Sequence, residues 1–291
     1  MRLSLGTAQI GSNYGLCNSS GIMKFSEAKK IINFAKNNGI NSIDTAINYG
    51  DSELILGKIG VQDFQVTTKL PEISCEETNI SQWMCQHLEK SLSRLKILKM
   101  YSVLLHRPDQ LLGPRGIELY EGLQNLKKSG LVEKVGISIY SPDELEPIFK
   151  NFYLDQVQAP INAIDRRMIS SGWLRKLYDK KVEVHARSVF MQGLLLTSRH
   201  DIPMKFSKWN KVWDTWDQWL STQDISPLDA CINYVNSFPE ISTLIVGVDS
   251  LTQIEDIVSA TRFSQSSLQF PKELMSTDLN LINPSNWKKL A

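Results

Sequence analysis

The chain has 291 residues, of which 42% are hydrophobic and 22% are charged, a composition typical of a globular protein with a large apolar core. Its formal net charge is +1 and no basic run carries interleaved aromatic residues, so nucleic acid is not expected as a partner. No apolar stretch reaches membrane-spanning length and the first residues lack a signal-peptide pattern, which predicts a cytoplasmic protein without a membrane partner. The four cysteines form no CxxC pair and are too few for a disulfide framework, as in a reduced compartment: Cys17, Cys75, Cys85 and Cys231.

Strand-like and helix-like segments alternate along the first half of the chain. Ser26 is expected to cap a helix that ends near Gly39. A short helix follows the second strand, residues 79–95 repeat apolar side chains at helical spacing, and a further helix ends near Gly130. The strand-like runs between these helices are 3–7, 41–46, 65–70, 100–105 and 134–139.

The second half of the chain continues the same alternation. Residues 141–144 read SPDE, which supplies an N-cap serine, a first-turn proline and a glutamate at the capping-box position. A helix is expected near residues 173–180, another begins at Ser226-Pro227, and Ser250 can cap the last one. The strand-like runs in this half are 155–158, 182–188 and 243–248.

Eight strand–helix alternations without a linker predict an α/β fold, a single (β/α)₈ TIM barrel domain over residues 1–291. A doubly wound sheet is the alternative. It would need a Gly-rich phosphate turn after an early strand, and no GxGxxG occurs. The P-loop, HExxH and EF-hand patterns are also absent, and no metal site is expected.

Two segments fall outside the regular barrel pattern. Between the seventh strand and the next helix, large apolar residues recur at helical spacing and predict an extra helical insertion: Trp209, Trp213, Trp216 and Leu220. This stripe can pack the inserted helix on the barrel rim, or it can form an aromatic wall or lid for a substrate. A less regular C-terminal extension follows Ala260, and its apolar residues are expected to pack on the barrel: Leu281, Ile282 and Trp287.

Four polar residues lie at or just beyond the ends of successive strand-like runs: Asp44, Tyr49, Lys69 and His106. The carboxyl ends of parallel strands gather on one face of an α/β barrel, so these side chains are expected to meet in one pocket. A tyrosine near a lysine, a carboxylate and a histidine can transfer a proton to a carbonyl oxygen. Taken singly, Tyr49 could be a packing residue and His106 a strand-end cap. Lys69 could belong to a structural ion pair, or be the Schiff-base nucleophile of a barrel aldolase.

Several motifs surround these residues in a fixed order. Residues 44–50 read DTAINYG and precede Ser52-Glu53 and Gly57, residues 68–71 read TKLP, and residues 104–108 read LLHRP. Together with Gly6-Thr7-Ala8 at the first strand, this pattern resembles the aldo-keto reductase family over nearly the whole chain. The resemblance implies an oxidoreductase that uses NADP(H) or NAD(H). Its substrate would be a small-molecule carbonyl compound, an aldehyde or ketone that is reduced to an alcohol, or the reverse.

The resemblance also assigns roles to the four polar residues. Tyr49 would be the general acid in reduction and the base in oxidation, and Lys69 would lower its pKa from an ordinary value near ~10. Asp44 would hold Lys69 charged and oriented, and His106 would orient the substrate carbonyl. The alternative from another functional class is a cofactor-binding sensor or scaffold that turns over little.

Cofactor contacts follow from the resemblance residue by residue. Ser138 and Gln158 match the pair that contacts the nicotinamide carboxamide, whereas Ile139 stands where the family often has asparagine. Arg187 replaces an aromatic residue that often stacks on the nicotinamide, so a guanidinium plane could stack there instead. Asp249 stands where relatives place a basic residue for a 2′-phosphate, which keeps NADH open beside NADPH. The expected cofactor-binding residues are Gly6, Thr7, Ala8, Asp44, Ser138, Gln158, Arg187, Ser188, Phe190, Gln192, Gly193, Leu194, Gly247, Asp249, Ser250, Gln253 and Asp256.

Two groups of these residues also have a purely structural interpretation. Ser250 and Gln253 could be only the N-cap of the last helix and its N3 partner. The loop residues after Arg187 could be ordinary packing residues. A sugar-like substrate would suit the aromatic stripe, and the short N-terminus with its Arg-Ser-x-Phe segment is similar to relatives linked to carbohydrate metabolism.

Overall fold

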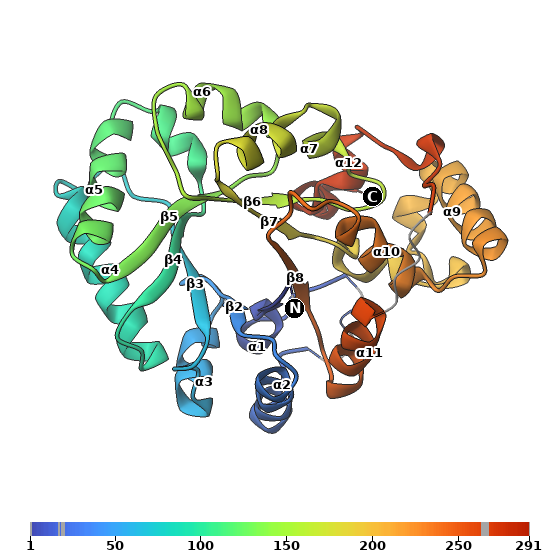
Figure 1. Ribbon diagram of the computed structural model, residues 1–291, viewed down its shortest axis with the longest axis horizontal. Coiled ribbons are helices and arrows are strands. Elements are labelled where there is room, and N and C mark those ends of the chain that lie inside the picture. Colours follow the sequence, from blue (N-terminus) through green and yellow to red (C-terminus); the bar gives the residue numbers. More distant parts are fainter. Residues whose placement is uncertain (1, 17, 19–20, 263–267, 291) are drawn as a thin grey trace.

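Eight parallel strands close into a barrel, and the helices surround it (Figure 1). The computed structural model describes residues 2–16, 18, 21–262 and 268–290. Each strand pairs with the next along the chain and β1 pairs with β8, so the barrel has no free sheet edge. The strands are β1 (Leu3–Gly6), β2 (Ser42–Asp44), β3 (Gln65–Leu70), β4 (Met100–Leu105), β5 (Val132–Ser138), β6 (Gln156–Pro160), β7 (Glu183–Arg187) and β8 (Thr243–Gly247).

The helices follow the strands in the order that a (β/α)₈ barrel requires, which confirms the predicted fold class. The α-helices are α1 (Ala8–Gly11), α2 (Phe25–Asn37), α3 (Ser52–Ile59), α4 (Ile80–Leu95), α5 (Gly116–Lys128), α6 (Leu145–Phe149), α7 (Arg167–Ser170), α8 (Trp173–Asp179), α9 (Asn210–Gln223), α10 (Pro227–Asn236), α11 (Leu251–Arg262) and α12 (Leu279–Ile282). The 3₁₀ helices are η1 (Pro108–Leu112), η2 (Pro142–Glu144), η3 (Met191–Leu196), η4 (Arg199–Asp201), η5 (Met204–Trp209), η6 (Lys272–Leu274) and η7 (Pro284–Lys289).

Two predicted helix caps are found where the sequence placed them. The hydroxyls of Ser141 and Ser226 accept backbone N–H groups in the first turns of η2 and α10, as predicted. The predicted cap at Ser26 is wrong. Helix α2 begins at Phe25, because the carbonyl of Lys24 already accepts the first helical hydrogen bonds.

Strand register brings the polar residues of the barrel mouth together. Gly6 lies opposite Asp44, and Asp44 lies opposite Thr67. Lys69 is two residues beyond Thr67, so its side chain points to the same side of β3 as that of Thr67. The register of the strands therefore places Lys69 beside Asp44 inside the barrel, although 25 residues separate them in the chain.

The predicted insertion is confirmed between β7 and α10, where it comprises η3, η4, η5 and α9. The tryptophans of α9 are buried, and the indole N–H groups of Trp216 and Trp219 donate to the carbonyls of Leu195 and Gln269 at 3.2 and 3.0 Å. The aromatic stripe therefore packs the inserted helix against its surroundings, as expected of an amphipathic helix.

The C-terminal extension packs largely on this insertion, beside α9 in Figure 1. The Trp287 ring meets the Phe206 ring edge-on at a centroid distance of 5.1 Å. Trp209 donates its indole N–H to the Asp278 carboxylate at 3.1 Å. Leu281, Ile282 and Trp287 are all buried, but Trp287 packs on Phe206 of the insertion and not on the barrel as expected.

No helix in the described part of the chain is both long and apolar enough to cross a membrane. Cys75, Cys85 and Cys231 are free thiols. Cys17 lies outside the residues that the structure describes.

Candidate active site

Asp44 and Lys69 form a buried ion pair at the carboxyl ends of β2 and β3. The Lys69 ammonium donates to both carboxylate oxygens of Asp44, at 2.8 and 2.7 Å, and to the carbonyl of Thr45 at 3.0 Å. Lys69 is 1% exposed and Asp44 is 5% exposed. A buried charge needs such partners, because an unpaired ion in the interior is strongly unfavourable.

Tyr49 is held next to this pair by a close backbone contact. The Tyr49–Gly50 turn packs directly on the backbone of Gly11 at the end of α1. A Cβ atom at Gly11 would overlap the carbonyl oxygen of Tyr49, and a Cβ atom at Gly50 would overlap the carbonyl oxygen of Gly11. Gly50 also has a φ of 52°, which favours glycine. The Lys69 ammonium lies 5.2 Å from the centroid of the Tyr49 ring. This packing fixes Tyr49 at the wall of the barrel mouth.

The electrostatic surroundings keep the Tyr49 hydroxyl protonated. Burial raises the pKa of Tyr49 above its ordinary value and the Asp44 charge raises it further, while Arg187 acts in the opposite direction. The pKa of Tyr49 is therefore raised overall, although Lys69 was expected to lower it. The physical reason is that burial and the nearby Asp44 carboxylate outweigh the positive charge that acts on Tyr49.

His106 follows β4 and faces Tyr49 across the barrel mouth. The two ring centroids are 6.2 Å apart and the rings are nearly perpendicular, at 76°. Burial lowers the pKa of His106 to about 4, and the positive charges of Lys69 and Arg187 act in the same direction. At neutral pH His106 is therefore an uncharged imidazole with one N–H donor.

Ser138 and Gln158 connect to the same network from β5 and β6. The Ser138 hydroxyl donates to the side-chain oxygen of Gln158 at 3.2 Å, and the Gln158 amide donates to Asp44 at 2.7 Å. Their Cα atoms are register partners across the two strands. This chain of hydrogen bonds joins the residues predicted for the carboxamide to those predicted for proton transfer.

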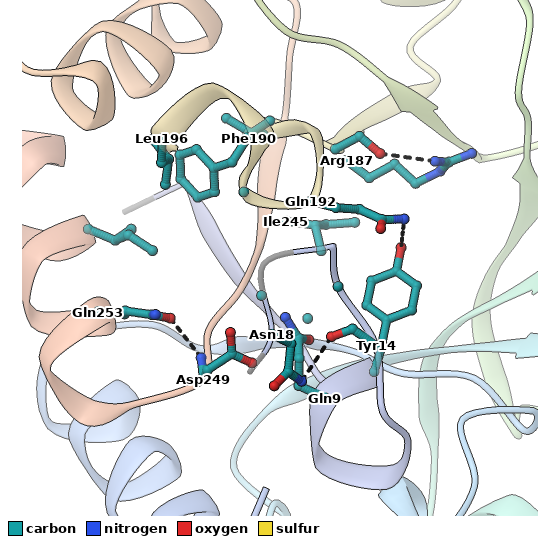
Figure 2. Close-up of a pocket in the computed structure, with 18 of the residues that line it drawn as sticks. Gln9, Tyr14, Asn18, Arg187, Phe190, Gln192, Leu196, Ile245, Asp249 and Gln253 are labelled. Atoms are coloured by element: carbon teal, nitrogen blue, oxygen red, sulfur yellow. Dashed lines mark hydrogen bonds between the residues drawn. The ribbon is translucent and has the colours of Figure 1, made fainter. Parts of the chain in front are cut away.

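A pocket of about 380 Å³ opens at this end of the barrel, a volume within the range of small-molecule sites. Figure 2 shows Arg187, Gln192 and Tyr14 along one side of it and Asp249 with Gln253 on the opposite side. The lining residues are Gly6, Thr7, Ala8, Gln9, Tyr14, Gly15, Asn18, Asp44, Tyr49, Gln158, Arg187, Ser188, Val189, Phe190, Gln192, Gly193, Leu196, Thr197, Leu228, Ile245, Gly247, Asp249, Gln253, Asp256 and Ile257.

Most residues predicted to bind a cofactor line this pocket, but three do not. Ser138 reaches it only through Gln158, and Leu194 is buried in the loop after β7. The Ser250 hydroxyl accepts the backbone N–H of Gln253 at 3.3 Å, as a helix cap does. The tryptophans of α9 are also absent from the lining residues, so the aromatic stripe is not a wall of this pocket.

The loop after β7 contains several residues with left-handed backbone conformations. Ser188, Met191 and Gln192 have φ values of 58°, 48° and 55°, and Gly193 has a φ of 92°. Left-handed conformations at non-glycine residues store strain and cluster at ligand sites. Trp216 helps to hold this loop, because its indole donates to the Leu195 carbonyl.

Several residues that line the pocket could not be predicted from the sequence. Tyr14 and Asn18 belong to the loop between α1 and α2, and Gln9 lies within α1. The Gln192 amide donates to the Tyr14 hydroxyl at 3.3 Å, across 178 residues of sequence (Figure 2). Loop residues carry no periodicity, so only the folded chain shows that this loop reaches the site.

The residues of this pocket fit a nicotinamide dinucleotide. Gln158 and Ser188 supply amide and hydroxyl donors to the pocket, and the Asp249 carboxylate can accept hydrogen bonds from a ribose. The end of the Gln9 side chain packs against Gly247, where a Cβ atom would lie 2.6 Å from it. Within the described residues, no group of three or more His, Cys, Asp or Glu side chains could hold a metal ion.

Comparisons with known proteins agree with this site. The Aldo/keto reductase family model matches residues 2–274. The chain is 25% identical over 295 residues to an uncharacterized oxidoreductase of Bacillus subtilis, YqkF, covering 94% of each protein. It is 31% identical over 122 residues to D-arabinose 1-dehydrogenase of Saccharomyces cerevisiae, covering 39% of this chain and 36% of that one.

A solved structure has the same fold. The holo form of an aldo-keto reductase from Bacillus halodurans aligns with a TM-score of 0.70 and 20% identity, over 100% of this chain and 92% of that chain. The barrel, the polar residues at its mouth and the match along almost the entire sequence lead to one assignment. This chain belongs to the aldo/keto reductase family, NAD(P)H-dependent oxidoreductases that act on small carbonyl compounds.

Proposed function

We propose that this enzyme reduces an aldehyde or ketone to an alcohol, with Tyr49 as the proton donor. The observation that carries the proposal is the position of Tyr49, whose protonated hydroxyl lies at the pocket wall beside neutral His106. A general acid must hold its proton until the transition state, and burial together with Asp44 does this for Tyr49. The oxidation of an alcohol by the same site would use Tyr49 as the base.

The mechanism follows from the roles of four side chains. When bound, a nicotinamide cofactor supplies a hydride for the carbonyl carbon. Tyr49 gives its proton to the carbonyl oxygen as negative charge develops there, and the His106 N–H orients that oxygen. Lys69 and Asp44 hold a fixed, nearly neutral dipole behind Tyr49 and contribute no proton of their own.

Binding of the cofactor would use both sides of the pocket. Gln158 and, through it, Ser138 would hold the carboxamide, while Gly247, Asp249 and Gln253 would line the adenosine side. Arg187 is the only lysine or arginine among the residues that the structure shows lining the pocket, and it lies on the side away from Asp249 (Figure 2). We therefore propose NADH as the preferred cofactor, since the adenosine side offers carboxylates and no cation to a 2′-phosphate.

The substrate is proposed to be a polyhydroxylated, sugar-like carbonyl compound. The side of the pocket near Tyr49 offers hydrogen-bonding groups from Tyr14, Gln192 and Arg187, which suit hydroxyl groups better than an alkyl chain. The partial similarity to D-arabinose 1-dehydrogenase supports this class.

A single-turnover experiment tests the proton donor. Enzyme loaded with reduced cofactor is mixed with a panel of aldehydes and ketones, and the loss of reduced-cofactor absorbance is followed. Tyr49→Phe should bind cofactor normally and react about two orders of magnitude more slowly with the best substrate. Tyr178→Phe, at an exposed tyrosine of α8, is the matched control and should react normally. Cofactor binding without oxidation by any carbonyl would instead support the sensor or scaffold, and near-normal turnover of Tyr49→Phe would remove Tyr49 from the mechanism.

A further inference from the structure

Arg187 is a cation at the active site without an acidic partner. It is the last residue of β7 and lines the pocket that Tyr49 also lines. Its guanidinium donates to the Ser188 hydroxyl at 3.2 Å and to the Ile139 carbonyl at 2.8 Å. Across the described residues it pairs with no carboxylate, unlike Arg94 with Glu53. The protein therefore leaves the charge of Arg187 uncompensated.

The other charges around Tyr49 do not cancel that of Arg187. Asp44 is already paired with Lys69 through two hydrogen bonds. The other acidic side chains lining the pocket are Asp249 and Asp256, and Figure 2 shows Asp249 on the side opposite Arg187. Arg187 is therefore left without a counter-charge on its own side of the pocket.

The guanidinium is oriented for a ligand. Its central carbon lies 4.6 Å from the centroid of the Tyr140 ring, so stacking fixes the guanidinium plane. An arginine has five N–H donors in a planar fork, and the two hydrogen bonds to Ser188 and Ile139 use only part of them. Such a fork binds carboxylate or phosphate oxygens in a bidentate manner.

Tyr14 adds a second donor on the same side. Its hydroxyl oxygen accepts the Gln192 amide at 3.3 Å, which leaves the Tyr14 O–H proton to donate to a ligand. Arg187 and Tyr14 lie on one side of the pocket in Figure 2. Arg187 comes from the end of β7 and Tyr14 from the loop after α1, so a ligand held by both would contact two segments distant in the sequence.

We propose that Arg187, with Tyr14, binds an anionic group of the substrate, so that the enzyme selects carbonyl compounds that carry a carboxylate or a phosphate. This inference rests on the proposed carbonyl reduction and specifies its substrate class. A neutral sugar would leave the guanidinium unpaired, whereas an acidic one would neutralise it in a partly desolvated site. A charge-assisted contact of this kind corresponds to a preference of about tenfold to a hundredfold.

Matched pairs of substrates test the proposal. The pairs are glyoxylate with glycolaldehyde, D-glucuronate with D-glucose, and D-glyceraldehyde 3-phosphate with D-glyceraldehyde. The measured quantity is the ratio of kcat/KM for the anionic member to that for the neutral member. The parent enzyme should prefer the anionic member by about tenfold or more in at least one pair. The carboxylate and phosphate pairs distinguish the two chemical sources of the anion.

Variants of Arg187 identify the residue responsible. Arg187→Gln should reduce the ratio to about one, and Arg187→Lys should retain part of it because a charge remains. Arg107→Gln is the control, since exposed Arg107 follows His106 but is paired with Asp109 and Glu72. It should leave the ratio unchanged. The dissociation constant of NADH, measured by protein fluorescence, tests the alternative that Arg187 contacts the nicotinamide, and on this proposal it should stay the same in Arg187→Gln.

Three outcomes would overturn the proposal. The first is an anion preference that persists in Arg187→Gln, and the second is a parent without any such preference. The third is weaker NADH binding in Arg187→Gln with an unchanged substrate ratio, which would place the guanidinium against the cofactor. If no carbonyl is reduced by the parent, the proposed function fails separately. Calorimetric binding of tartrate, a carbonyl-free dicarboxylate, then decides the anion site: binding lost in Arg187→Gln supports it, and equal or absent binding in both proteins refutes it.

Discussion

Removing the charge of Lys69 should destabilise the protein strongly while creating almost no cavity. Met is unbranched and close to Lys in length, so Lys69→Met keeps the packing of a side chain that is 1% exposed. It leaves Asp44, 5% exposed, with the Gln158 amide as its remaining side-chain donor. Breaking one half of a buried ion pair costs about 3–5 kcal/mol, because the other charge stays buried without compensation.

The expected loss is large compared with the total stability. Folded domains are stable by about 5–15 kcal/mol. For a chain of this length each kcal/mol lowers the melting temperature by about 2 °C, so Lys69→Met should melt about 6–10 °C below the parent. Denaturant unfolding followed by tryptophan fluorescence, together with calorimetry, measures both quantities without any need for substrate or cofactor.

A second variant separates the lost charge pair from any loss of packing. In the double variant Asp44→Asn/Lys69→Met no charge remains, so it should be more stable than Lys69→Met by about 2 kcal/mol or more. Asp44→Asn alone should also be destabilised, because it leaves the Lys69 ammonium buried. The reasoning is refuted if Lys69→Met loses less than about 1 kcal/mol, or if the double variant is no more stable than Lys69→Met.

Three further predictions concern positioning, pH and cofactor choice. Gly11→Ala should lower the free energy of unfolding by about 1–3 kcal/mol and slow turnover, since the new Cβ atom would overlap the Tyr49 turn. The control Gly113→Ala should change neither quantity. Equal effects of the two substitutions would contradict the proposed close packing of Gly11 on the Tyr49 turn. The pKa of His106 is about 4 in the folded protein and about 6.5 in the unfolded chain. As the pH drops, His106 is therefore protonated in the unfolded chain before it is protonated in the folded protein. The free energy of unfolding should fall by about 3 kcal/mol between pH 6.5 and pH 4. Denaturation of His106→Gln should show a smaller drop over that interval, and an equal drop would disprove the shift. Asp249→Arg should raise the affinity for NADPH relative to NADH at low salt, and a ratio that does not respond would show that Asp249 is not near the ribose.

The sequence by itself determined the barrel and the identity of its four central polar residues. The alternation of apolar strands and amphipathic helices leaves few ways to bury both, and parallel strands must present their carboxyl ends on one face. Asp44, Lys69 and His106 lie at or next to such ends, so their meeting follows from topology alone. The helix caps at Ser141 and Ser226 could also be predicted from the sequence, because capping depends on residues that are neighbours in the chain.

Some features depended on contacts that no local pattern records. The direction of the Tyr49 pKa is one of them, because it depends on burial and on whether Asp44 or Lys69 dominates the local charge. The sequence supplied both residues but not the hydrogen bonds that pair Asp44 with Lys69. The tryptophan stripe of α9 was likewise ambiguous, since helical spacing gives a face but not the surface against which that face packs.

Only the tertiary structure decided which residues complete the pocket. Tyr14 and Gln192 come from loops 178 residues apart and meet through one hydrogen bond. Arg187 stood out in the sequence as an unusual residue, but its lack of an acidic partner is a property of the folded chain. Loops have no periodicity, and the balance of charges in a pocket depends on distances in space. A one-dimensional pattern does not contain these quantities.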